Sequence, residues 1–171
     1  MYTLNELLRT LPQRGRVQWI GVRPAREQPM LAVREVEIEI GSGLRGDRYK
    51  GNPQSKRQVT LIQAEHLVAV GAMLGREPIE AALVRRNIVV SGINLLALHA
   101  SRFRIGRVLL EGTGQCHPCS RMEAALGPGG YNAMRGHGGI TARVIEPGPV
   151  RVGEEVWLAN CLESVRVTGD E

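Results

Sequence analysis

The sequence predicts a mainly β protein, a closed or nearly closed β-barrel with a few short peripheral helices. The chain has 21 glycines among 171 residues and only 4% aromatic residues, which favours many strands joined by tight turns. Apolar segments of strand length outnumber segments with helical periodicity. A sheet of many strands has edges to protect, and closure into a barrel removes them. The seven strand candidates contain Trp19, Val36, Val59, Ile88, Leu109, Val144 and Val156.

The length indicates one main domain with a small addition at each end. We expect an N-terminal helical appendage over residues 1–16, a barrel domain over residues 17–159, and a C-terminal tail over residues 160–171. In the tail, Val165 and Val167 indicate one more short strand.

The individual elements follow from periodicity and from residues that start or stop them. A helix over residues 3–11 begins at a capping box formed by Thr3 and Glu6, and Pro12 ends it. The spacing of the strands is not that of repeated strand–helix–strand units. Strands are expected over residues 16–23, 30–40, 56–62, 85–93, 108–110, 140–145 and 155–158. Helices are expected over residues 63–74, 77–84 and 120–126, with a turn over 112–114.

The charge balance favours a small anionic ligand. The net charge is +5 and the pI about 9.6, and only Lys50 and Lys56 among the 22 basic residues are lysines. Arginine presents a fixed fork of donors that suits phosphate and carboxylate groups. Few aromatic side chains are available for stacking on bases, so we expect no nucleic acid partner. No apolar run has the length of a membrane span, and we expect no membrane partner.

Cysteine content indicates the compartment. The chain has three cysteines, an odd number, and no apolar leader segment at its N-terminus. Both features favour the reducing cytoplasm, where a C-x-x-C pair is more often catalytic or metal-binding than structural. Cys161 is taken as incidental, so attention falls on Cys116 and Cys119.

The segment over residues 108–122, VLLEGTGQCHPCSRM, places these thiols between a strand and a helix. A helix N-terminus offers free N–H donors and a partial positive charge, both of which favour a thiolate. Arg121 acts in the same direction, and Pro118 fixes the backbone before Cys119. Of the two sulfurs, Cys119 is the candidate reactive thiol because it lies nearer the start of the helix.

Three mechanisms fit a C-x-x-C pair here. Thiol–disulfide exchange has the right spacing but lacks the expected βαβ context. A zinc site would need a second pair of ligands, and the sequence offers only His117 and the distant Cys161. A single soft thiolate can instead hold a transition metal carried by an organic cofactor. That third mechanism needs a rigid thiol, arginines and glycine-rich loops, and the sequence contains all of them.

Two polar segments are candidates for anion binding. Residues 41–54, GSGLRGDRYKGNPQ, form a glycine-rich basic loop without the ending of a phosphate-binding P-loop. Arg86 and Asn87 stand at the start of a strand, where they would hold a planar polar ligand. Spacing alone leaves a purely structural role for this pair open.

A third glycine-rich segment follows the thiols directly. Six of the fifteen residues over 127–141 are glycine, and a structureless run of this kind inside a compact domain favours function. We expect a loop that wraps a ligand, with Arg135 and His137 projecting into the site.

Longer motifs make the chain resemble the MOSC domain family, which is related to the C-terminal part of molybdenum cofactor sulfurases. The matching segments span residues 17 to 158 in the family's order. They are GSGLRGDRYKG, RQVTLI, RRNIVVSGINLLAL, FRIGRVLLEGTGQCHPC and VRVGEEVWL.

The resemblance implies a β-barrel-like fold that binds the molybdenum cofactor, a pterin dithiolene with a phosphate. Pro118-Cys119 matches the family's Pro-Cys motif, which makes Cys119 the candidate molybdenum ligand. Arg86-Asn87 matches an element that implies cofactor contacts, and Gly46-Asp47 matches a Gly-Asp pair. The other residues expected at the cofactor are Arg57, Arg121, Arg135 and His137.

The activity implied is the reduction of small N-hydroxylated compounds, with electrons from an external donor protein. The alternative is a sulfur carrier with a persulfide on Cys119, and the additional Cys116 leaves room for such sulfur transfer. A ligand-binding module without catalysis is the third interpretation. A homodimer is a candidate assembly.

Overall fold

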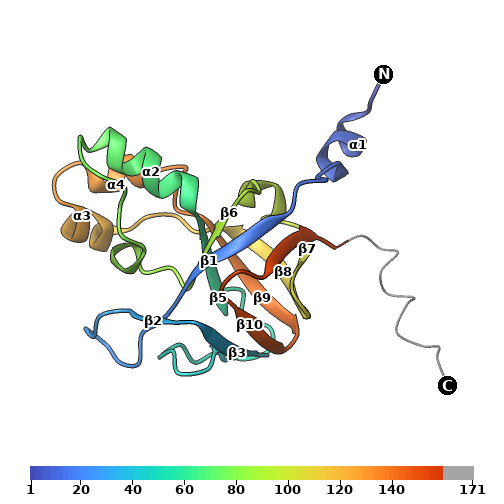
Figure 1. Cartoon of the computed structure of the whole chain (residues 1–171), viewed down its shortest axis with the longest axis horizontal. Helices are drawn as coiled ribbons and strands as arrows, with labels where there is room; N and C mark the ends of the chain where they lie inside the picture. The colour runs from blue at the N-terminus through green and yellow to red at the C-terminus, as the bar shows by residue number, and fades with distance from the viewer. Residues whose placement is uncertain (160–171) are drawn as a thin grey trace.

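The computed structural model describes residues 1–159, in which seven strands close into a barrel (Figure 1). Their order around the barrel is β1-β6-β5-β9-β8-β7-β11, and pairing of β11 with β1 closes it. The predicted closed barrel with few short helices is confirmed. Its strands are β1 (Gly15–Val22), β5 (Val59–Gln63), β6 (Ile88–Ser91), β7 (Arg102–Ile105), β8 (Val108–Gln115), β9 (Ile140–Glu146) and β11 (Glu155–Leu158).

One pair of barrel strands is parallel, unlike the antiparallel pairs around it. β5 and β6 run parallel, with the helix α2 (Ala64–Met73) and the 3₁₀ helix η1 (Ala81–Val84) in the connection between them. The strand spacing did not indicate this βαβ unit. Every residue of β5 is buried, as expected for a strand covered on both faces.

Short strands outside the barrel account for the other difference. The single strand expected over residues 30–40 is two, β2 (Leu31–Val33) on the edge of β1, and β3 (Glu35–Glu39). β3 lies between β10 (Gly148–Arg151) and β4 (Gly43–Leu44) in a separate three-stranded sheet. The strand of Val36 is therefore not a barrel strand, and β7, which contains Phe103, is the seventh.

Two apolar clusters hold the fold together. The larger fills the barrel and contains Phe103, Leu110 and Ile20, together with Val36 and Ile38 from β3. Burial of one such side chain stabilises the fold by about 1.5–3 kcal/mol. Another 3₁₀ helix, η2 (Leu95–Leu98), contributes its first and last residues to this cluster.

The second cluster attaches the helices to the outside of the barrel. Ile62 of β5 and Val89 of β6 point outward and meet Leu67, Met122 and Met134 from three helices. These helices are α2, α3 (Ser120–Leu126) and α4 (Gly130–Met134), which gather at one end of the molecule (Figure 1). The segment that carries the thiols is therefore fixed between barrel and helices.

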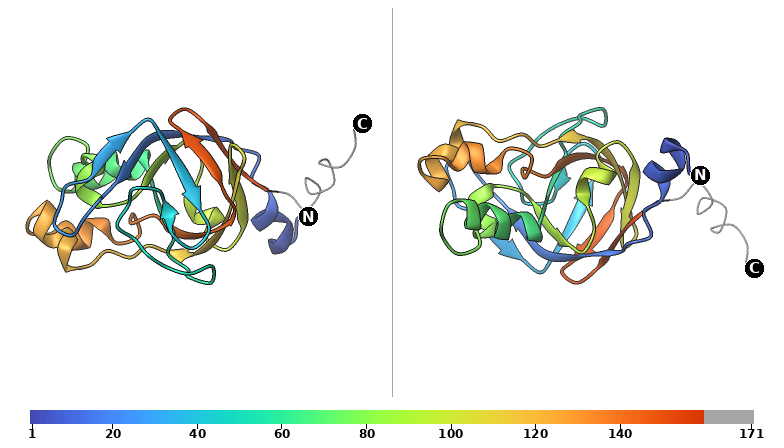
Figure 2. Two further views of the ribbon diagram at one scale, coloured as in Figure 1. Left: turned by 90° about the horizontal axis from the view of Figure 1, so that it is seen from below. Right: turned by 90° about the horizontal axis from the view of Figure 1, so that it is seen from above.

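The N-terminal helix lies at the opposite end of the molecule (Figure 2). α1 (Leu4–Arg9) begins at the predicted capping box of Thr3 and Glu6 and has no buried residue. None of the described helices has the length and apolar character needed to cross a membrane. The tail over 160–171, with its expected strand and Cys161, lies outside the described residues.

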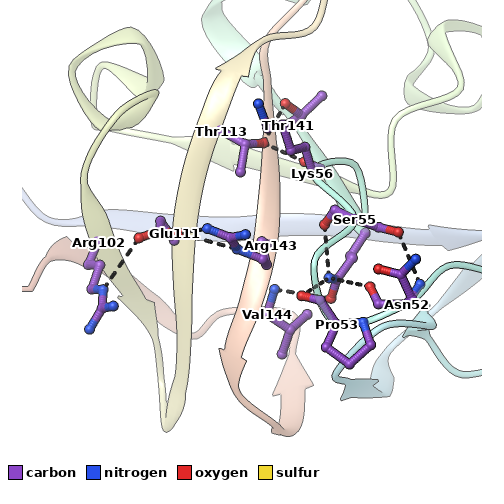
Figure 3. A network of polar contacts seen from close by, with 11 residues as sticks. Asn52, Pro53, Ser55, Lys56, Arg102, Glu111, Thr113, Thr141, Arg143 and Val144 are labelled. Atoms are coloured by element: carbon purple, nitrogen blue, oxygen red, sulfur yellow. Dashed lines mark hydrogen bonds and ion pairs between the residues drawn. The ribbon is translucent and has the colours of Figure 1, made fainter.

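A buried glutamine anchors the long glycine-rich loop after β3. The amide oxygen of Gln58 accepts from the backbone N–H of Gly41 and of Val144, and its amide nitrogen donates to the carbonyls of Asn52 and Ser55. Figure 3 shows the contacts of this glutamine with Val144, Asn52 and Ser55, beside the β8–β9 pair. There Glu111 pairs with Arg102 and Arg143, and Thr113 donates to the carbonyl of Lys56. The loop is thus held against the barrel wall.

Candidate functional site

The segment that carries the two thiols follows β8, which is eight residues long. β8 continues through residues 112–114, where a turn was expected, because an irregular register with β9 accommodates them. Gly112 is needed there, since a Cβ would lie 2.0 Å from the carbonyl oxygen of Leu98. Cys119 is the N-cap residue of α3 and is exposed, whereas Cys116 is only 1% exposed.

Cys119 opens onto a cavity of about 680 Å³, which we call the thiol cavity. Its lining contains a single acidic side chain, Asp47, and seven basic ones. The basic side chains are Arg23, Arg48, Lys50, Arg57, Arg85, Arg86 and Arg121. A cavity with this balance of charge attracts anions, because nothing of opposite sign inside it neutralises most of the cations.

Burial and a hydrogen bond keep Cys116 away from the cavity. Nη2 of Arg57 donates to the sulfur of Cys116 over 3.2 Å, and the chain returns from there to the surface at Cys119. Cys116 is absent from the lining residues of the thiol cavity, whereas Arg57 is among them. The two thiols of the motif therefore have different surroundings, one buried beside a cation and one facing the cavity.

Arg86 is buried to 4% exposure and holds three separate segments together. Its guanidinium donates to the carbonyls of Gly138 (2.8 Å), Val84 (2.8 Å) and Cys116 (3.2 Å). Burial lowers the pKa of this guanidinium, and the nearby Cys116 opposes that shift. Arg86 thus fixes the backbone behind the thiols, and it is also one of the residues that line the thiol cavity.

The amide of Asn87 is likewise engaged with protein. Its oxygen accepts from the backbone N–H and the hydroxyl of Thr60, at 3.1 and 2.9 Å. Its nitrogen donates to the carbonyl of Gly21 over 3.3 Å. Asn87 therefore joins β1, β5 and β6 at the point where they border the thiol cavity.

Asp47 connects the glycine-rich loop to the end of β1. Its carboxylate accepts from the backbone N–H of Arg23 (2.7 Å) and of Tyr49 (3.2 Å). Burial raises the pKa of Asp47, and the hydrogen bond from Tyr49 opposes this. The N–H of Arg48 in turn donates to the carbonyl of Arg23 over 2.7 Å. Arg23 and Arg48 are consequently held side by side on the wall of the cavity.

The guanidinium of Arg23 contains an unsatisfied donor. Among the described residues, its Nε is the one buried side-chain nitrogen or oxygen atom without a hydrogen-bond partner. An unpaired buried donor of this kind costs about 1–3 kcal/mol. Because Arg23 lines the cavity, a bound acceptor there would remove that cost.

Arg85 adopts a backbone conformation that residues other than glycine rarely adopt. It ends η1 in the left-handed region, with φ of 60°. Burial lowers the pKa of Arg85, the positive charge of Arg121 lowers it further, and Cys119 opposes the shift. Strained conformations cost about 1–3 kcal/mol and cluster at functional sites.

The glycine-rich segment after the thiols is not the open loop that was expected. It contains α4, and two of its glycines allow close backbone packing. A Cβ on Gly138 would lie 2.1 Å from the carbonyl oxygen of Cys116, and one on Gly139 would lie 1.8 Å from that of Leu61. The N–H of Cys116 also donates to the carbonyl of Gly139 over 2.8 Å.

Arg135 and His137 are not part of the cavity lining. Arg135 is exposed, and the ring of His137 packs edge-on against that of His66, with centroids 4.8 Å apart. These two side chains, which were expected to project into the site, therefore lie outside the thiol cavity. The reason is that the glycines turn the backbone toward β5 and Cys116, so that neighbouring side chains point elsewhere.

The other expected site residues do come together. Cys119, Arg57, Arg86, Asn87 and Arg121 all line the thiol cavity. Sequence reasoning missed Arg23 and Arg85 as members. The sequence placed Arg23 at the end of an expected strand and Arg85 directly before the Arg-Asn pair. Neither position by itself distinguishes a binding-site arginine from an ordinary surface arginine.

No ready-made metal site is formed by protein side chains alone. Within residues 1–159, no three His, Cys, Asp or Glu side chains are grouped so that they could hold an ion. A metal at Cys119 would need its other ligands from a cofactor or from solvent.

The family model of the MOSC domain matches residues 44–157, which include most of the glycine-rich loop, the Arg-Asn pair and the thiol segment. The chain belongs to the MOSC domain family. The resemblance stated from the sequence motifs is thereby confirmed for most of the barrel. MOSC proteins are associated as a family with the molybdenum cofactor, so the cavity at Cys119 is the place to consider for it.

Solved structures show the same fold. The YUAD protein from Bacillus subtilis superposes with a TM-score of 0.74 at 19% identity, covering 86% of this MOSC chain and 97% of its own. YiiM from Geobacillus stearothermophilus gives 0.68 at 18% identity, covering 85% and 75%. YiiM from Escherichia coli gives 0.66 at 18%, covering 86% and 71%. No match to this chain is found among curated proteins.

Proposed function

We propose that the thiol cavity binds the molybdenum cofactor and that the protein reduces small N-hydroxylated compounds. The observation that supports this most directly is the exposed thiol of Cys119 on a cavity with seven basic side chains and one acidic one. A soft thiolate suits molybdenum, and arginine forks suit a phosphate. The two halves of the cofactor thus have matching partners in one cavity.

The residues present fit the group in a second respect. The buried Nε of Arg23 has no partner in the protein, and the phosphate of the cofactor is an acceptor of the right charge. Asp47 and a backbone hydrogen bond fix the main chain of Arg23 and Arg48, so the two arginines start from neighbouring positions on the cavity wall. We assign the phosphate to these arginines together with Lys50 and Arg57.

Arg86 and Asn87 are assigned a positioning role. Three carbonyls occupy the guanidinium of Arg86, and Thr60 and Gly21 occupy the amide of Asn87. Both keep the wall of the cavity and the backbone of Cys116 in place. Arg135 and His137 lie outside the cavity and are not assigned to the cofactor.

The proposed reaction converts an N–OH group to N–H, consumes two electrons and two protons, and releases water. When bound, the cofactor would supply the two-electron chemistry at molybdenum, and an external donor protein in the cytoplasm would supply the electrons. The protein's own part is to hold the metal through Cys119, to bind the phosphate, and to orient the substrate in the remainder of the cavity.

The test is metal and cofactor analysis of protein made in a host that synthesises the cofactor. We expect stoichiometric molybdenum, pterin fluorescence after oxidation, and reduction of an amidoxime with a chemical electron donor. Cys119→Ala should abolish the activity, and Cys116→Ser is the matched control that should retain it. Protein that carries neither molybdenum nor pterin from such a host would overturn the proposal.

One observation favours a second candidate, a sulfur carrier with a persulfide on Cys119. The exposed Cys119 has a second thiol three residues away, and a persulfide anion would be stabilised by the same cations. Cyanide-labile sulfur without molybdenum would support this candidate. Finding neither labile sulfur nor molybdenum would favour a binding module without catalysis.

A further inference from the structure

A second cavity adjoins the thiol cavity. It has a volume of about 390 Å³, and we call it the outer cavity. Four arginines line both cavities and so form the boundary between them: Arg23, Arg48, Arg85 and Arg121. Arg26, Glu27, Ala124 and Ala125 belong only to the outer cavity.

The outer cavity has the same excess of positive charge. Five arginines line it, against the single carboxylate of Glu27. That carboxylate is 3.9 Å from Arg26, and both side chains are largely exposed. An exposed ion pair at this distance contributes little. Glu27 is the only acidic residue that lines the outer cavity, so the four shared arginines have no other acidic partner there.

Backbone strain coincides with this cavity. Within residues 1–159, Glu27 and Arg85 are the non-glycine residues with positive φ, at 63° and 60°. Both line the outer cavity. The strain at Arg85 directs a partly buried guanidinium to the boundary, close to the like charge of Arg121. Bound anions relieve such repulsion, and strain of this kind is retained where a site requires it.

The number of cations exceeds what one phosphate requires. A phosphate monoester carries about two negative charges, whereas the two cavities together present eight basic side chains. Arg23, whose buried Nε has no hydrogen-bond partner, lines both cavities. A phosphate held by Arg23 and Arg48 in the thiol cavity therefore leaves Arg85 and Arg121 without an acidic partner among the residues that line the two cavities.

From these observations we infer that the outer cavity is a second anion-binding subsite, which takes a carboxylate or phosphate group of the substrate. The ligand class is an acidic N-hydroxylated compound, whose N–OH group faces Cys119 while its anionic group rests among Arg26, Arg85 and Arg121. This assignment of the ligand rests on the proposed function, but the existence of the anion subsite does not.

The subsite is tested first on protein from a host that cannot make the cofactor. Tungstate is the probe, because it is a dianion of phosphate shape that anomalous X-ray scattering locates. We expect tungstate in both cavities. Arg26→Glu should weaken tungstate binding in the outer cavity about tenfold. Lys50→Glu should weaken tungstate binding in the thiol cavity about tenfold and leave binding in the outer cavity unchanged. Tungstate confined to the thiol cavity, or outer binding indifferent to Arg26→Glu, would overturn the inference.

The source of the anionic group is tested on the cofactor-loaded protein. A neutral amidoxime and the same compound with a carboxylate are compared by kcat/KM. We expect the acidic compound to be preferred, and Arg26→Glu to remove that preference without changing molybdenum content. Loss of molybdenum in Arg26→Glu would instead assign the outer group to the cofactor and overturn the substrate assignment. Absence of molybdenum in the unaltered protein overturns the proposed function but leaves the tungstate result standing.

Discussion

Nη2 of Arg57 donates a hydrogen bond to the sulfur of Cys116 over 3.2 Å. The cation thus lies between a buried thiol and the cavity onto which Cys119 opens. The C-x-x-C motif consequently does not present two equivalent sulfurs. One is packed within the wall and one is free to react, which decides which of them can serve as a ligand or carry sulfur.

Differential alkylation of the two thiols follows from this arrangement. Iodoacetamide should modify Cys119 rapidly in the native protein and leave Cys116 unmodified, because Cys116 is almost entirely buried. Fragment mass spectra of the peptide that contains both will separate the two sites. In denaturant both should react, which serves as the control. Equal native rates at the two sulfurs would contradict the geometry.

Removing the Arg86 guanidinium should destabilise the whole fold. In Arg86→Gln the carbonyls of Gly138, Val84 and Cys116 lose their charged donor, at an expected cost of about 2–4 kcal/mol of unfolding free energy. Arg135→Gln is the matched control, because Arg135 is exposed and its loss should cost less than about 0.5 kcal/mol. Urea unfolding followed by fluorescence measures both. A stable Arg86→Gln that fails only to retain cofactor would favour direct cofactor contact.

The sequence predicted those features of the thiol cavity that have a local sequence pattern, and it did not predict the contacts between distant residues. The thiol segment, the Arg-Asn pair and the barrel were recognisable because each has a local pattern that long motifs preserve. The three carbonyls that occupy Arg86 come from residues 84, 116 and 138, and no local pattern reports such distant partners. An arginine that holds the wall and an arginine that binds a ligand have the same sequence signature.

Asn87→Ala should also act through stability. Its amide satisfies the N–H and hydroxyl of Thr60 and the carbonyl of Gly21, all at a buried junction of three strands. We expect a loss of about 2–3 kcal/mol. Gln18→Ala is the control on the same strand pair, because its bond to the Ser91 hydroxyl is exposed and should be worth less than about 1 kcal/mol. Equal losses of stability in the two variants would contradict the prediction that the buried hydrogen bonds of Asn87 contribute more than the exposed one of Gln18.

Two glycines of the segment after the thiols separate backbone conformation from steric contact. Gly136 and Gly139 both have positive φ, at 77° and 85°, but only Gly139 would place a Cβ against another atom. Gly136→Ala should therefore cost about 1–2 kcal/mol, the usual cost of the left-handed conformation. Gly139→Ala adds a clash with the carbonyl of Leu61 and should cost more than about 4 kcal/mol or prevent folding. Thermal unfolding and soluble yield compare the two, and similar values would contradict the packing explanation.

This glycine run also explains why Arg135 and His137 do not line the thiol cavity. A cluster of glycines looks the same in sequence whether it frees a loop or lets backbones approach closely. Here it does the second, and Arg135 and His137 are carried away from the cavity as a result. The βαβ unit of β5 and β6 was also missed, because the apolar pattern of these two strands resembles that of the antiparallel strands of the barrel.

The paired rings of His66 and His137 predict a dependence of stability on pH. Burial lowers the pKa of His66 below its ordinary value of 6.5, the charge of His137 lowers it further, and Glu65 opposes the shift. Because the folded pKa is the lower one, the unfolded chain binds the proton first, and folding stability falls as the pH drops through about 6.5 toward the folded pKa. The urea midpoint should therefore be lower at pH 5 than at pH 7.5. His66→Gln should flatten this decrease, and His137→Gln should reduce it in part, because the repulsive charge is gone. A midpoint that rises on acidification, or a slope unchanged in His66→Gln, would show that another group controls the pH dependence.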